Sequence, residues 1–151
     1  AIVVSDKGHA EGVRMRDFGD FANPASPRNA ALVECGQHWE TESIEVAKDC
    51  VTGFLRHTGV VPVDFAQERM AKRPSRLPQR VYQVSGPVTI KTDSFRFAQD
   101  WRGFEHLAKG SLIGHDGDEA VLAPHEPTVL IMPTRRLWPG KTAVRLAFPV
   151  L

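Results

Sequence analysis

The stretch Ala30-Ala31-Leu32-Val33-Glu34-Cys35-Gly36-Gln37-His38 joins an apolar run to a carboxylate, a glycine and a polar pair. The run from Asn29 to Cys35 predicts a β-strand, and the residues after it predict a loop that leads into a helix. A carboxylate is costly to desolvate, so a glutamate at the end of a buried strand is seldom there for packing. In open α/β sheets, sites are built at the carboxyl ends of strands. Glu34 is therefore the first candidate for a functional residue.

Two roles are open for Glu34. In the functional interpretation it is a general base, and Gly36 lets a ligand or another backbone segment approach closely. In the structural interpretation it forms an ion pair at a sheet edge with an arginine such as Arg14, Arg16 or Arg28. The residue pattern alone does not choose between these roles.

Two neighbours of Glu34, Cys35 and His38, suggest a thiolate nucleophile and its base. Adjacent side chains in a strand point to opposite faces, which favours packing for Cys35. The six histidines include no His-x-x-x-His pair and the chain has no Cys-x-x-Cys motif, so no metal ligand is assigned within it. His38 shares a loop with Glu34 and is a candidate substrate-binding residue.

A polar and aromatic segment lies between two of the predicted strands near the end of the chain. It contains Arg135-Arg136 and Trp138-Pro139-Gly140. Trp138 is a second candidate substrate-binding residue, at the rim of a substrate entrance. The alternative is a plain turn that carries surface arginines.

The bulk composition limits the class of protein. The chain has 151 residues, of which 42% are hydrophobic, enough for one domain or two small ones. Its 19 basic and 18 acidic residues nearly balance, which gives no electrostatic reason to expect a nucleic acid or an anionic membrane as partner. No apolar run approaches the ~20 residues of a membrane span, and two cysteines do not make a disulfide framework. These features predict a soluble, cytoplasmic protein.

The chain falls into three predicted parts. Residues 1–60 have α/β character, with a first strand over residues 1–4 and an amphipathic helix that begins near Trp39 and ends at Gly59. The first strand has nothing ahead of it, and we expect the chain to be a piece of a longer protein. Residues 61–79 are basic and proline-rich, which is typical of a linker. Residues 80–151 predict an all-β domain of barrel or sandwich type, with strands over residues 80–90, 94–98, 111–114, 120–122, 128–132 and 143–148.

These motifs together resemble the succinylglutamate desuccinylase/aspartoacylase family of zinc hydrolases, which belongs with the zinc carboxypeptidases. The run Leu32–His38 and the helix after it match the family's strand that ends in Glu-x-Gly. Lys109–Gly114 matches its turn into a strand, and Val129–Pro133 with Pro139–Ala143 matches its ending. The family's His-x-x-Glu zinc ligands, its later zinc-binding histidine and its substrate-binding arginines have no counterpart here. The resemblance therefore covers the C-terminal portion of the family only.

The resemblance implies a fold and a chemistry. The fold is the remnant of a zinc-carboxypeptidase-like α/β sheet followed by the small all-β domain. The chemistry is hydrolysis of a linear amide in an N-acyl amino acid or similar small molecule, with Glu34 as general base on water bound to Zn²⁺. The zinc ligands are expected outside this chain, so the N-terminal half of the catalytic domain is an implied partner and the isolated chain is expected to be inactive. An oligomer is possible.

Two other functions compete with this interpretation. The short strands and glycine turns from Lys109 to Ala147 also suit a non-catalytic binding module of the biotinyl/lipoyl half-barrel type. Such carriers present a lysine at a hairpin tip, whereas the candidate turn over residues 123–127 has none. The other alternative is a thiol enzyme that uses Cys35 and His38.

Overall fold

The computed structural model describes residues 2–6, 12–36, 40–72 and 78–150. The chain forms two compact units. One unit, here called the β unit, contains residues 1–7 and 77–151, and the other, the helical unit, contains residues 8–76. Within the described residues, no helix has the length and apolar character needed to cross a membrane.

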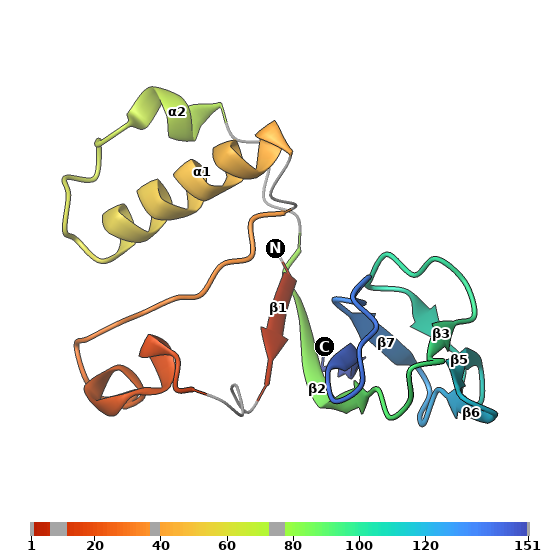
Figure 1. The fold of residues 1–151 in the computed structure, drawn as a ribbon. Coiled ribbons are helices and arrows are strands. Elements are labelled where there is room, and N and C mark those ends of the chain that lie inside the picture. The colour runs from red at the N-terminus through yellow and green to blue at the C-terminus, as the bar shows by residue number, and fades with distance from the viewer. Residues whose placement is uncertain (1, 7–11, 37–39, 73–77, 151) are drawn as a thin grey trace. The chain divides into compact units, whose positions relative to one another are not determined.

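The β unit consists of two sheets (Figure 1). The larger has the strand order β1 (Ile2–Ser5), β2 (Arg80–Thr89), β8 (Thr142–Pro149), β7 (Thr128–Ile131) and β4 (His106–Leu107). The smaller has the order β3 (Arg96–Phe97), β5 (Leu112–Asp116) and β6 (Glu119–Leu122). β1 pairs with β2 in parallel and the other neighbours pair antiparallel.

The predicted strands of the β domain all form, and β4 is an addition to them. The two sheets share a core in which Ile113 of β5 packs with Leu130 of β7, Val144 and Leu146 of β8. This arrangement is sandwich-like, and the described strands do not close into a barrel. The chain is thus a mixed α/β protein with two sheets. This agrees with the prediction that it contains both helices and β-sheet.

Ser85-Gly86-Pro87 consists of residues that are common in turns, yet it interrupts neither the strand predicted over residues 80–90 nor the observed β2. It lies inside β2, where the pairing with β8 shifts register between Val84 and Gly86. Such a shift marks a β-bulge, which accommodates a proline and a glycine within a strand without ending it.

The buried Asp116 holds the turn after β5 to the segment that follows β2. Its carboxylate accepts hydrogen bonds from the backbone N–H groups of Lys91 at 2.7 Å and Thr92 at 2.9 Å, and from the Thr92 hydroxyl at 2.7 Å. The Thr92 hydroxyl and these two N–H groups hold the pKa of Asp116 below its ordinary value.

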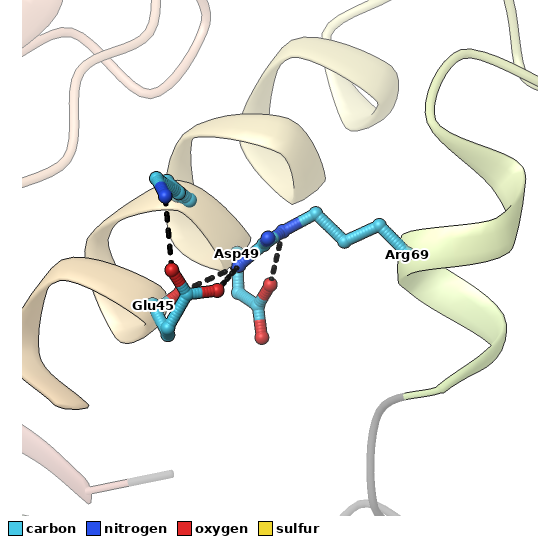
Figure 2. A network of polar contacts seen from close by, with 4 residues as sticks. Glu45, Asp49 and Arg69 are labelled. Atoms are coloured by element: carbon cyan, nitrogen blue, oxygen red, sulfur yellow. Dashed lines mark hydrogen bonds and ion pairs between the residues drawn. The ribbon is translucent and has the colours of Figure 1, made fainter.

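The helical unit contains α1 (Thr41–His57) and α2 (Gln67–Ala71), after two 3-10 turns, η1 (Met15–Asp17) and η2 (Gly19–Phe21). The 3.6-residue periodicity predicted α1 correctly. α2 lies within the segment predicted as a linker. Figure 2 shows Arg69 of α2 reaching Glu45 and Asp49 of α1. Its Nη2 lies 2.9 Å from Glu45 Oε2 and its Nε lies 2.7 Å from Asp49 Oδ1.

The strand predicted over residues 29–35 is wrong for this structure. These residues pair with no strand of the described part of the chain. Leu32 and Val33 are 58% and 46% exposed. An apolar run with β propensity becomes a strand only where a neighbour takes up its N–H and C=O groups.

Candidate functional site

Glu34 lies in the unpaired segment that leads to α1, and it is exposed. Gly36, two residues later, has a φ of +123°, and a Cβ atom added to it would lie 2.9 Å from Ser43 Oγ and 3.8 Å from Glu40 Oε2. Glycine thus permits both the backbone conformation and the close approach to the first turn of α1. The sequence predicted a close approach at Gly36, and the structure shows that the helix start is the group approached. Glu34 precedes this glycine by two residues, and its side chain is exposed.

The three arginines considered as ion-pair partners of Glu34 contact other carboxylates. Arg14 Nε lies 2.5 Å from Asp17 Oδ2, and Arg16 Nε lies 3.5 Å from Asp17 Oδ1. Arg28 Nη1 lies 2.9 Å from Asp20 Oδ2. The three guanidinium groups therefore have other acidic partners. These contacts do not support the alternative in which Glu34 forms an ion pair with one of the three arginines.

The other predicted site residues are not brought together with Glu34 by the described contacts. Cys35 is a free, half-buried cysteine. His38 lies outside the described residues, so its role and its pairing with Cys35 stay predictions. Trp138 belongs to the β unit, where the residue is 61% exposed and its carbonyl accepts a hydrogen bond from Lys141 N at 3.1 Å.

The described residues do not by themselves fit a zinc ion. Nowhere in residues 2–6, 12–36, 40–72 and 78–150 do three or more His, Cys, Asp or Glu side chains gather so that they could hold a metal. A catalytic zinc site has three protein ligands and a fourth coordination position that is open to water or substrate.

Two histidine contacts in the β unit were missed by sequence reasoning. His125 Nε2 lies 3.0 Å from Ser85 Oγ, and its Nδ1 lies 3.0 Å from the carbonyl oxygen of Pro127. His106 Nε2 lies 3.3 Å from the hydroxyl oxygen of the buried Tyr82. The Ser85–His125 and Tyr82–His106 contacts join residues that are 40 and 24 positions apart, and no local motif signals such a pair.

Curated relatives share sequence with about half of this chain. Succinylglutamate desuccinylases from three strains of Vibrio cholerae are each 30% identical to it over 82 residues, which are 52% of this chain and 24% of the relative. The chain is related to the succinylglutamate desuccinylases. The resemblance inferred from the Glu-x-Gly run and the C-terminal turns is confirmed. The chain spans about a quarter of the length of these desuccinylases, and no family model matches it.

Solved desuccinylase structures match a larger part of the chain. The X-ray structure of succinylglutamate desuccinylase from Vibrio parahaemolyticus is 25% identical, with a TM-score of 0.47, over 59% of this chain and 28% of that one. The crystal structure of the Vibrio cholerae enzyme is 24% identical, with a TM-score of 0.44, over 65% of this chain and 30% of that one.

Proposed function

We propose that residues 1–151 are the C-terminal portion of a hydrolase that deacylates an N-acyl amino acid, with Glu34 as general base. The observation that carries the proposal is the match to succinylglutamate desuccinylases, and it is supported by a Glu-x-Gly run whose glycine approaches the first turn of α1. N-succinylglutamate is the first substrate to test, because the relatives are named for it.

The chemistry assigned to Glu34 needs an accessible, ionised carboxylate. Glu34 accepts a proton from the water that attacks the acyl carbonyl carbon, and gives a proton to the leaving nitrogen as the amide C–N bond breaks. The products are a carboxylate, such as succinate, and a free amino acid. The exposure of Glu34 supports this role, since a carboxylate already committed to a buried ion pair could not do this work.

The complete enzyme is proposed to use Zn²⁺, in keeping with the family resemblance. In that resemblance the zinc ligands come from the N-terminal half of the catalytic domain, and we propose that they lie outside residues 1–151. His38 and Trp138 are proposed as contacts to the substrate, and residues 1–151 alone are expected to be inactive.

Glu34→Gln in the complete polypeptide tests the proposal. The amide keeps the size of the side chain and removes its basicity, so kcat for release of glutamate from N-succinylglutamate should fall by a factor of about 10² or more. Glu42→Gln, in the first turn of α1, is the matched control and should leave kcat unchanged. Near-normal turnover of Glu34→Gln, or an equal loss in the control, would contradict the assignment.

A further inference from the structure

The Ser85–His125 contact places a hydroxyl group beside an imidazole nitrogen within the β unit. Ser85 stands at the bulge of β2, where the pairing with β8 shifts register, and it is exposed. His125 lies in the segment between β6 and β7 and is half-buried. The distance of 3.0 Å from Ser85 Oγ to His125 Nε2 falls within the roughly 2.6–3.2 Å that separate a serine nucleophile from its base. The geometry is therefore that of a nucleophile and a general base.

The hydrogen bonds on the other side of the imidazole ring determine which nitrogen of His125 carries the proton. Nδ1 lies 3.0 Å from the carbonyl oxygen of Pro127 and 3.3 Å from the hydroxyl oxygen of Thr128. The buried Thr128 hydroxyl donates its own proton to the carbonyl oxygen of His125 at 2.7 Å, so at Nδ1 it acts as an acceptor. Two acceptors thus hold a proton on Nδ1, and in the neutral ring Nε2 keeps its lone pair toward Ser85.

The hydroxyl proton of Ser85 has two acceptors within reach. Ser85 Oγ lies 3.1 Å from the carbonyl oxygen of Leu146 and 3.0 Å from His125 Nε2. A hydroxyl group has a single proton, and rotation about the Cβ–Oγ bond moves it from the carbonyl oxygen to Nε2. The proton can therefore be given to His125 without displacing a heavy atom of either side chain.

We propose that Ser85 and His125 form a nucleophile–base pair that hydrolyses small activated carboxylic esters. Ser85 Oγ bonds to the ester carbonyl carbon while its proton passes to His125 Nε2, and Nδ1–H remains bonded to the carbonyl oxygen of Pro127. The ester C–O bond then breaks, and Nε2 gives the proton to the departing alcohol oxygen. Water attacks the acyl-serine with the same base, which releases the carboxylic acid and restores the Ser85 hydroxyl. This activity is separate from the proposed deacylation and uses residues of the β unit alone.

Phe148 supplies an apolar surface beside the base. Its ring lies edge-on to that of His125, with the ring centroids 5.6 Å apart and the planes at 89°, and Phe148 is 38% exposed. An aromatic group of an ester can pack against such a ring. Aryl esters such as p-nitrophenyl acetate are therefore the first class of substrate to test.

A fluorophosphonate probe, which forms a covalent adduct with serines activated by a neighbouring base, tests the pair. Mass spectrometry of the labelled 151-residue chain should place the adduct on Ser85. Ser85→Ala should abolish this adduct, and His125→Gln should slow its formation by a factor of about 10². Ser94→Ala is the matched control, because the Ser94 hydroxyl contacts Thr92 Oγ1 at 3.1 Å and no imidazole, and it should leave labelling unchanged. The absence of an adduct on Ser85, or equal labelling of His125→Gln, would overturn the proposal.

Turnover of p-nitrophenyl acetate gives a second readout. The unsubstituted chain should release a burst of p-nitrophenolate as the acyl-serine forms, and Ser85→Ala should lack the burst. If Ser85→Ala fails to fold, as judged by thermal unfolding, the position of the adduct in the unsubstituted chain decides. A lower midpoint temperature in both variants without an adduct on Ser85 would show that the pair only joins β2 to the segment before β7.

Both measurements are made in EDTA, which removes any hydrolysis by bound Zn²⁺. Labelling of Ser85 in EDTA is independent of Glu34 and of the zinc chemistry proposed for the complete enzyme. An adduct on Ser85 without deacylation of N-succinylglutamate would reject the proposed function and keep the nucleophile–base pair. Deacylation that depends on Glu34, with no adduct on Ser85, would do the reverse.

Discussion

The two units of the chain differ in how far their apolar residues are buried. In the β unit, Ile113, Val129, Leu130 and Val144 have no exposed surface. In the helical unit, residues of the same kind, such as Ile44 and Val51, are more than half exposed. Periodicity is clear in both units, so an amphipathic pattern establishes which face is to be buried but does not guarantee that the covering surface is present.

Truncating one apolar side chain in each unit should give the largest difference between the units in the free energy of unfolding. Leu130→Ala removes a fully buried side chain from the core between the sheets and should lower the free energy of unfolding by about 3 kcal/mol. Val51→Ala, at an exposed position, should change it by less than about 0.5 kcal/mol. Urea unfolding of residues 1–151, followed by tryptophan fluorescence, measures both. A similar loss of unfolding free energy in the two variants would contradict this difference between the units.

Adding one methyl group at a glycine sharpens the comparison. A Cβ at Gly114 would lie 2.5 Å from the carbonyl oxygen of Arg96, which belongs to the paired strand β3. Backbone must move to admit it, so Gly114→Ala should cost about 2 kcal/mol. Gly86→Ala, with nothing within 4 Å of the added Cβ, is the control in the same unit and should cost much less.

Gly36→Ala is the corresponding change in the helical unit. Its φ of +123° strains any other residue, and its added Cβ meets the Ser43 hydroxyl. Because no apolar side chain is buried in residues 12–36 and 40–72, faster amide exchange should be confined to the first turn of α1. Thermal unfolding of the β unit should stay the same, and a shift in that transition would show that the units unfold together.

Acid should weaken the β unit through Asp116. Its pKa is lower in the folded protein than the ordinary value of 3.8, chiefly through the Thr92 hydroxyl. The stabilisation is therefore present above the unfolded pKa and is lost as pH falls through the folded one. Asp116→Asn should abolish this part of the pH dependence and lower the midpoint temperature by roughly 5 °C at neutral pH. An unchanged acid slope in the variant would exclude Asp116 as its source.

The smallest effect is expected at the exposed ion pairs of the helical unit. Lys48 and Arg69 hold the pKa of Glu45 below its ordinary value of 4.5. Arg69→Gln should raise that pKa toward 4.5, as measured by NMR titration, with a minor effect on overall stability. Lys48→Gln is the matched control and should also raise the pKa of Glu45, but it should leave α2 in contact with α1.

Much of the secondary structure could be predicted from the sequence because it is set locally. The periodicity of residues 41–57 and the alternation in the β unit gave the helix and its strands. The 29–35 strand failed because strand formation needs a partner that the sequence of the strand does not contain. The bulge at Ser85-Gly86-Pro87 could not be predicted, because a bulge and a turn use the same residue types.

The candidate site was predictable only in part. Glu34 and Gly36 stand out because a carboxylate and a glycine follow an apolar run. The Ser85–His125 and Tyr82–His106 contacts join residues 40 and 24 positions apart in the sequence, and a short motif cannot indicate contacts between such distant residues.

The parallel pairing of β1 with β2 makes the helical unit a topological insertion. Ile2 of β1 is aligned with Arg80 of β2. The chain between these two strands therefore leaves the sheet after β1 and returns to it at β2. Closing so large a loop has an entropic cost, which the pairing of the four residues of β1 with β2 helps to offset. β1 is an edge strand of the larger sheet. Its detachment would free one anchor of the helical unit while the antiparallel strands of the β unit remain paired.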